Sequence, residues 1–159
     1  MVAGKSKRGA IVVSACLLGR PCRFDGKDKL TPELAFALEG RNVIAVCPEE
    51  LGGLETPRAA CQISGGDGTD VLDGNARVID ADGIDQTEAF LSGARAAMEP
   101  ALAAGAREAI LKERSPSCGV KHVYHDGASG PGQGVFAALL ARNGIRVIDE
   151  VRAMRRKKG

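Results

Sequence analysis

The sequence predicts a single α/β domain, Rossmann-like in its three layers and built on a mainly parallel sheet. The chain of 159 residues is most simply one domain and is long enough to bury a sizeable core. Its short apolar runs lack polar alternation, as expected for strands covered on both faces. These runs alternate with helical patterns, an order typical of parallel sheets with helical crossovers. We expect the domain to span residues 9–151, between a flexible lead-in at residues 1–8 and a basic tail at residues 152–159.

Apolar runs at four places are predicted as the buried strands of this sheet. They lie within residues 9–15, at Asn42–Val46, at Glu108–Leu111 and at Ile145–Ile148. Val120–Tyr124 is expected to add a short extra strand. A turn at Asp73-Gly74-Asn75, inside residues 71–79, predicts a small hairpin insertion.

Helices are predicted between these strands. Residues 31–33 combine a threonine N-cap, a proline and an acid, which predicts a helix to about Leu38. The clearest helical periodicity begins at residues 85–87, and Pro100 is expected to kink or break that helix. A third helix is expected at Val135–Arg142. The segments that follow the first three strands are rich in Gly and Pro and are predicted as loops.

Composition and charge exclude several classes of protein. The net charge is +2 and much of the basic surplus lies in the tail, so no basic field indicates nucleic acid as the main partner. No apolar run reaches the ~20 residues of a membrane span, and the apolar patch near the N-terminus is too short for a signal peptide. These features predict a cytoplasmic protein. Its five cysteines are then expected to be metal-binding, catalytic or core residues rather than disulfides.

Three of the cysteines lie just beyond the carboxyl ends of predicted strands: Cys16, Cys47 and Cys118. Parallel strands place these ends on one edge of the sheet, where ligands bind in open α/β folds. Converging thiols indicate a soft-metal or iron–sulfur site, or a redox pair. Three ligands would leave a coordination position open, as in catalytic metal sites. Cys22 is interpreted as loop filler, with a spare thiol or sulfur acceptor as the alternative, and Cys61 as a small buried hydrophobe.

Several motifs in these loops resemble one known family. They are Ser14–Gly19 with Arg23–Gly26, Cys47-Pro48-Glu49 with Gly52–Leu54 and Pro57-Arg58, and Lys112–Gly119. In order and spacing they are similar to motifs of the bacterial 2-thiouracil desulfidases and their formerly uncharacterised relatives. The likeness runs from about Ile11 to Ile148. Cys61-Gln62 departs from the Pro-x-Glu-Ile pattern expected there, a difference that bears on the substrate more than on the metal site.

The resemblance implies an oxygen-sensitive [4Fe-4S] cluster held by Cys16, Cys47 and Cys118, with the fourth iron free to take the substrate's sulfur. The implied reaction removes sulfur from a thiolated pyrimidine, 2-thiouracil-like, or from a related thioamide. Water supplies the oxygen and sulfide is released via the cluster. A free base, a nucleoside and a thiolated tRNA are all compatible with this implication, as is a homodimer.

The same resemblance implies roles for five further residues. Glu49 matches the catalytic carboxylate and is expected to deprotonate water. Ser115 matches the active-site serine, with Ser117 close behind, and is expected to donate a hydrogen bond or relay a proton. Arg58 is expected to hold an anionic or carbonyl group of the substrate or to pair with a local acid, and Ser14 is expected to contact the substrate.

Two other functions stay open at this point. One is a cluster-independent thiol sulfurtransferase that uses Cys118 or Cys16 as a persulfide carrier. The other is a non-catalytic iron–sulfur or redox-sensing module. The sulfurtransferase would work in air without iron, and a sensor would lack turnover, whereas the desulfidase needs its cluster.

Overall fold

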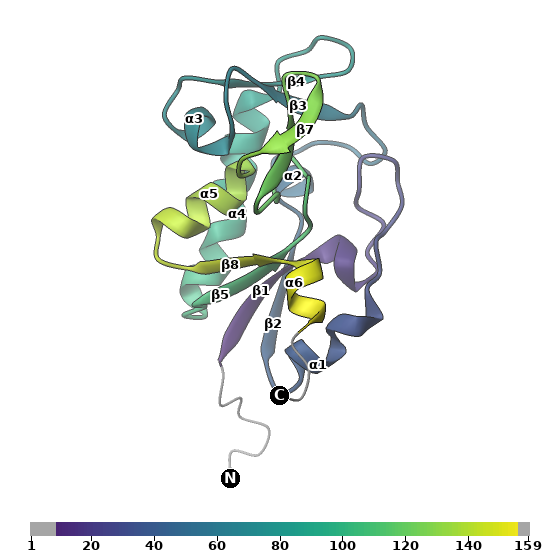
Figure 1. Cartoon of the computed structure of the whole chain (residues 1–159), viewed down its shortest axis with the longest axis vertical. Helices are drawn as coiled ribbons and strands as arrows, with labels where there is room; N and C mark the ends of the chain where they lie inside the picture. The colour runs from purple at the N-terminus through teal and green to yellow at the C-terminus, as the bar shows by residue number, and fades with distance from the viewer. Residues whose placement is uncertain (1–8, 156–159) are drawn as a thin grey trace.

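A computed structural model describes residues 9–155 and arranges them around two four-stranded sheets (Figure 1). The first sheet has the strand order β2-β1-β5-β8 and is parallel throughout. Its strands are β1 (Ala10–Ser14), β2 (Asn42–Val46), β5 (Glu108–Leu111) and β8 (Arg146–Asp149). The mainly parallel sheet predicted from the sequence is therefore confirmed. One detail is wrong: β2 is an edge strand with exposed residues rather than a strand buried on both faces, because no strand within residues 9–155 pairs with its outer side.

Helices cover both faces of this sheet, which gives the three layers. On one face lie α4 (Thr87–Ala103) and α5 (Val135–Arg142), and on the other lie η2 (Pro32–Leu34), α1 (Ala35–Leu38) and α6 (Glu150–Met154) (Figure 1). The side chains of β1 divide between two cores: Val12 packs in the core on the α4 and α5 side, whereas Ile11 and Val13 pack in the core beneath α1 and α6. Burial on both faces explains the unbroken apolar sequence of β1.

The second sheet lies above the carboxyl ends of the first, with the order β4-β3-β6-β7 (Figure 1). Its strands are β3 (Cys61–Ser64), β4 (Arg77–Asp80), β6 (His122–His125) and β7 (Ala128–Pro131). Strand β6 confirms the short extra strand expected near Val120–Tyr124. It continues into a hairpin with β7, which was not expected.

The hairpin predicted at residues 71–79 is wrong, because this segment begins as a helix, α3 (Gly68–Leu72). Asp67 and Asp70 form a capping box in which each side chain accepts a hydrogen bond from the other residue's backbone, and this starts the helix. Gly74 then adopts φ +80° and ends it. The turn residues thus terminate a helix, and β4 pairs with β3 instead.

Two segments expected as loops contain short helices: η1 (Ala15–Leu18) and α2 (Pro48–Leu51). Helix α4 runs through Pro100 without a break, because a proline this close to the end of a helix disturbs only the last turn. The expected lead-in, residues 1–8, and residues 156–159 of the expected tail lie outside the described residues, and the start of the tail is helical in α6. None of the helices in residues 9–155 is both long and apolar enough to cross a membrane.

Helix α2 sits directly on α4, and two glycines allow this contact. A Cβ atom at Gly93 would overlap the Pro48 carbonyl oxygen, and one at Gly52 would overlap the Ala89 carbonyl oxygen. The backbones of the two helices therefore touch where no side chain separates them. Because α2 follows Cys47 directly, this contact sets the position of that strand end.

We predict that Gly93→Ala lowers the free energy of unfolding by about 1–3 kcal/mol, the usual range for overpacking. In an isolated helix the same substitution should increase stability by up to ~1 kcal/mol. A loss of stability in the protein would therefore identify the close contact between α2 and α4 as its cause. Urea unfolding of the two proteins measures the difference. Ser92→Ala, on the exposed side of the same helix, is the matched control and should change stability by less than about 0.5 kcal/mol. Equal stability of Gly93→Ala and the parent would contradict the contact.

Candidate active site

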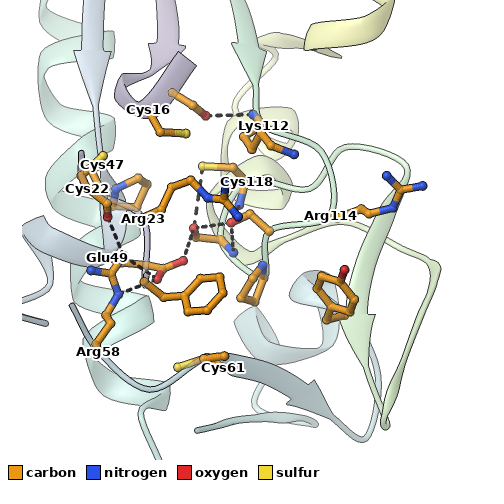
Figure 2. A pocket seen from close by; sticks show the side chains of 18 of the residues that line it. Cys16, Cys22, Arg23, Cys47, Glu49, Arg58, Cys61, Lys112, Arg114 and Cys118 are labelled. Carbon is orange, nitrogen blue, oxygen red and sulfur yellow. Dashed lines mark hydrogen bonds and ion pairs between the residues drawn. The ribbon is translucent and has the colours of Figure 1, made fainter. Parts of the chain in front are cut away.

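A cavity of about 640 Å³ lies between the carboxyl edge of the first sheet and the second sheet (Figure 2). All five cysteines of the chain contribute to its wall: Cys16, Cys22, Cys47, Cys61 and Cys118. None of them is paired in a disulfide. The structure therefore brings the three cysteines singled out at strand ends to one place, together with two others.

The register of the parallel strands explains why these thiols meet. Strand β1 pairs with β2 on one side and with β5 on the other, so that Ser14 lies opposite Val46. Cys47 directly follows Val46, and Cys16 lies in η1, just beyond the end of β1. Cys118 comes from the loop after β5. Because the three strands end at one edge, the thiols face a common space.

The loop from Lys112 to Gly119 is fixed at both of its ends. The backbone amides of Val135 and Phe136, at the start of α5, donate to the carbonyl oxygens of Pro116 and Ser117 at 2.9 and 2.8 Å. The loop thus supplies acceptors for amides that have no partner within the helix. A Cβ atom at Gly134 would overlap the Ser117 backbone, which shows how closely the loop and the helix approach.

Glu113 organises the other end of this loop. Its side chain is buried and accepts hydrogen bonds from four backbone amides, those of Arg114, Val120, Lys121 and His122, at 2.7–3.3 Å. Burial opposes ionisation, but these hydrogen bonds hold the pKa of the Glu113 carboxyl below its usual range. The sequence analysis missed this residue. An acid two residues after a buried strand, at the start of a turn-rich loop, was the available signal.

The thiols of the cavity differ in their ionisation. Burial raises the pKa of Cys16 to about 11, although Lys112 opposes the rise, and burial also raises the pKa of Cys118 well above its usual value. The pKa of Cys47 is lowered to about 7, first because the Cys22 thiol hydrogen-bonds to it. Neighbouring thiolates disfavour one another here, so a bound cation would be needed to ionise all of them.

These residues fit an iron–sulfur cluster. Cysteine thiolates are the ligands that hold such clusters. Cys16, Cys47 and Cys118 line one cavity at the ends of three neighbouring strands, so their sulfurs face a common space. A cationic cluster would remove the repulsion between their thiolates. We conclude that the donor set suits this cofactor.

Glu49 lies beside the thiols and is held by an ion pair. Its Oε1 accepts a hydrogen bond from Nε of Arg58 at 3.0 Å and forms an ion pair with Nη2 at 2.9 Å. Both side chains are largely buried, with 13% and 8% of their surface exposed. Arg58 is itself fixed by the carbonyl oxygens of Cys22 and Glu55. Of the two expected roles for Arg58, the structure thus shows the ion pair with a local acid.

The other oxygen of Glu49 ends a chain of hydroxyl groups. Ser117 Oγ donates to Glu49 Oε2 at 2.8 Å and lies 2.9 Å from Ser115 Oγ. Ser115 Oγ already accepts hydrogen bonds from the amides of Ser117 and Cys118. Because a hydroxyl donates one proton, these bonds direct Ser115 to donate to Ser117. Ser117 in turn has two acceptors, and Glu49 Oε2 at 2.8 Å is nearer than Cys118 Sγ at 3.7 Å. The chain therefore has one direction.

Ser14 and Cys61 take positions that the sequence did not predict in detail. Ser14 is buried, accepts a hydrogen bond from the Lys112 amide at 3.0 Å, and lies close enough to Cys118 to lower the pKa of its thiol. Its hydroxyl is thus used to join β1 to the loop. Cys61 lies at the cavity wall, partly buried and packed against the hydrophobic core, so its interpretation as a small buried hydrophobe holds only in part.

Two aromatic side chains line the same cavity and were not singled out from the sequence. Phe24 and Tyr124 are 40% and 48% exposed. The guanidinium of Arg23 lies 5.8 Å from the centre of the Phe24 ring. An exposed ring at a cavity wall offers a flat apolar surface to a planar ligand.

Fold and site together define a class of protein. A parallel α/β sheet carries thiols at its carboxyl edge, beside a buried carboxylate that accepts a directed hydrogen-bond chain. This combination is typical of a metal-dependent enzyme whose substrate binds in the cavity.

The comparison with known proteins identifies the family. A family model described as 2-thiouracil desulfurase matches residues 11–152, and the chain belongs to this family. The uncharacterized protein YbbK of Bacillus subtilis (strain 168) is 42% identical over 143 residues, which cover 88% of this chain and 95% of that protein. A solved structure, of the [4Fe-4S]-dependent thiouracil desulfidase TudS, matches with a TM-score of 0.77 and 41% identity. The match covers 91% of this chain and 92% of that one.

We predict that Glu113→Gln lowers the free energy of unfolding by about 1–3 kcal/mol at pH 7, because the buried amides lose a charged acceptor. The folded-state pKa of Glu113 is depressed, so its contribution is complete above the unfolded pKa of ~4.3 and is lost as the pH falls through the folded value. Urea unfolding of parent and variant at pH 7 and below pH 4 measures this. A stability difference that grows on acidification would contradict the prediction.

Proposed function

We propose that the protein is a [4Fe-4S]-dependent desulfidase that removes sulfur from a thiolated pyrimidine such as 2-thiouracil, or from a related thioamide. The observation that carries the proposal is the meeting of three strand-end thiols beside the Glu49 carboxylate and its serine chain. Membership in the 2-thiouracil desulfurase family supports it, as does the likeness to TudS, a [4Fe-4S]-dependent thiouracil desulfidase.

Cys16, Cys47 and Cys118 are proposed to hold the cluster. Three protein ligands would leave one iron open, and the bound cluster would supply a soft Lewis acid for the thiocarbonyl sulfur, which leaves as sulfide. Cys22 and Cys61 lie at the same cavity, but the Cys22 thiol hydrogen-bonds to Cys47 and Cys61 comes from the second sheet. Neither follows a strand end of the first sheet.

Glu49 is proposed to act as the general base toward a water molecule. The net reaction exchanges one atom: a thiocarbonyl and water give a carbonyl and hydrogen sulfide. Glu49 takes one proton from the water as the water oxygen bonds to the thiocarbonyl carbon, and it returns that proton to the sulfur. As the C–S bond breaks and the carbonyl forms, Glu49 takes the remaining hydroxyl proton and passes it to the departing sulfide, so hydrogen sulfide leaves and Glu49 is ionised again. Arg58 holds the carboxylate in place through Oε1, which leaves Oε2 toward the serines.

The serine chain is proposed to adjust as the charge on Glu49 changes. While Glu49 is ionised, Ser117 donates to it at 2.8 Å. When Glu49 is protonated, the Ser117 hydroxyl is free to turn toward the substrate, and Ser115 supports it in either orientation because it is fixed by two amides. The serines would thus keep the proton that Glu49 takes from water close to the thiocarbonyl carbon.

The cavity suits one nucleobase. Its volume of about 640 Å³ lies in the range of small-molecule sites, ~300–1,000 Å³. We propose that Phe24 and Tyr124 stack against the pyrimidine ring and orient its thiocarbonyl toward the thiols. A small-molecule substrate is therefore the proposal, and the homodimer and the cytoplasmic location stay predictions from the sequence.

The direct test is anaerobic reconstitution followed by turnover. We expect about four irons and four sulfides per chain, as for any [4Fe-4S] cluster, and conversion of 2-thiouracil to uracil and sulfide. Replacing Cys16, Cys47 or Cys118 by Ser should lower the iron content and abolish turnover. Iron-free protein that transfers sulfur in air at the same rate would overturn the proposal in favour of the persulfide carrier.

Glu49→Gln tests the base. The amide keeps the volume of the carboxylate but cannot take a proton, so we expect the cluster absorption to be retained and kcat to fall by about 10²–10⁴. Glu55→Gln, an exposed carboxylate in the same segment, is the matched control and should retain kcat. Retained turnover in Glu49→Gln would assign the proton transfer to another group.

A further inference from the structure

Three potential metal ligands lie together on one flank of the cavity. The sulfur atoms of Cys22 and Cys47 and a carboxylate oxygen of Glu50 are all within 4.8 Å of one another. Figure 2 shows Cys22 and Cys47 side by side, on the flank opposite Cys118. Only Cys47 belongs to the set of thiols proposed to hold the cluster. Cys22 and Glu50 have no role in the proposed reaction.

The chain positions these ligands from two segments. Cys47 is the N-cap of α2 and Glu50 is the third residue of that helix, so both face the same side of its first turn. The Cys47 thiol reaches the Cys22 carbonyl oxygen at 3.7 Å, which holds the segment after η1 against α2. Cys22 is only 2% exposed.

Glu50 is held in place but keeps ligand capacity. Thr56 Oγ1 donates to its Oε2 at 2.7 Å, and Arg20 pairs with its Oε1 at 3.1 Å. Each carboxylate oxygen carries two lone pairs, so one remains available on each. The Arg20 side chain is 61% exposed, and an ion pair this open to solvent contributes little.

From this geometry we propose that Cys22, Cys47 and Glu50 bind a single zinc-like divalent cation in protein that lacks its cluster. Two thiolates and a carboxylate are common zinc ligands, and water from the cavity completes four-coordination. Two thiolates on one tetrahedral zinc at ~2.3 Å stand about 3.8 Å apart, so the two sulfurs need to approach each other by about 1 Å at most.

The shared ligand makes this ion and the cluster mutually exclusive. Cys47 cannot bind both, so zinc bound here blocks cluster assembly until it is removed. The exclusion rests on the proposed function, in which Cys47 is a cluster ligand, but zinc binding itself does not. Cys22 is therefore needed for zinc to bind to the cluster-free protein. It is not needed for the cluster, because it is not one of the proposed cluster ligands.

The first experiment measures metal binding to reduced, cluster-free protein under anaerobic conditions. Titration with Co²⁺ reports thiolate coordination by its absorption bands, and displacement by Zn²⁺ gives the zinc affinity. We expect one equivalent per chain. Loss of a direct ligand should exceed the 10–100-fold effect of a supporting residue, so Cys22→Ser should weaken binding by more than about 100-fold. Glu50→Gln should weaken it by about tenfold or more.

Matched variants separate this site from the cluster site. Cys16→Ser and Cys118→Ser should bind zinc like the parent although they lose cluster ligands, and Cys61→Ser controls for removal of a cavity thiol. Unchanged zinc affinity in Cys22→Ser, or an equal loss in Cys16→Ser and Cys118→Ser, would overturn the proposal.

The second experiment measures competition. Zinc added before reconstitution should lower iron incorporation in the parent, whereas Cys22→Ser should incorporate iron with or without zinc. Equal inhibition of both proteins would contradict the shared-ligand mechanism. If no variant ever incorporates iron while zinc binding still depends on Cys22, the desulfidase proposal fails and the zinc site stands.

Discussion

The pairing of β1 with β2 and β5 is the constraint on which the site depends. Parallel strands in register end together, so residues that follow Ser14, Val46 and Leu111 meet at one edge although they are up to about a hundred positions apart. A slip of one residue in either pairing would turn every side chain of a strand to the other face and separate the thiols. Burial of β1 on both faces, with Val12 on one side and Val13 on the other, makes such a slip costly.

Backbone contacts then set the positions of the side chains at this edge. The glycine contact between α2 and α4 fixes the segment that carries Cys47 and Glu49. The start of α5 fixes Ser117 through two backbone hydrogen bonds. Glu113 accepts hydrogen bonds from the backbone amides at the base of the same loop. The ion pair of Glu49 with Arg58 and the serine chain are thus held in place by these surrounding contacts, which is how precise sites are built.

The electrostatic balance of the cavity favours a cation at the thiols. Burial raises the pKa of Cys16 and Cys118, and the thiolates repel one another, so the metal-free site resists full ionisation. Cys47 is the exception, because Cys22 stabilises its thiolate. Cys47 is a ligand in both proposals, so it connects the proposed zinc site to the proposed cluster site.

The sequence by itself determined the parallel sheet, most of its strands and helices, and the gathering of Cys16, Cys47 and Cys118, because these follow from local apolar patterns and from the common direction of parallel strands. The structure corrected signals that depend on competing local bonds. Residues 73–75 read as a hairpin turn, but the capping box of Asp67 and Asp70 starts a helix just before them. The position of β2 at the edge of the sheet could not be predicted from the sequence either, because strand order depends on contacts between distant segments.

Only the tertiary structure decided which groups touch. The partners of Glu49 come from Arg58, nine positions away, and from Ser117, 68 positions away, and no local pattern encodes that second contact. The same holds for Cys22, whose thiol lies against Cys47 from a segment 25 positions earlier, and for Phe24 and Tyr124 at the cavity wall. Sequence patterns report the face on which a side chain lies, whereas side-chain contacts depend on how the two sheets pack, and packing is fixed only when the whole chain is folded.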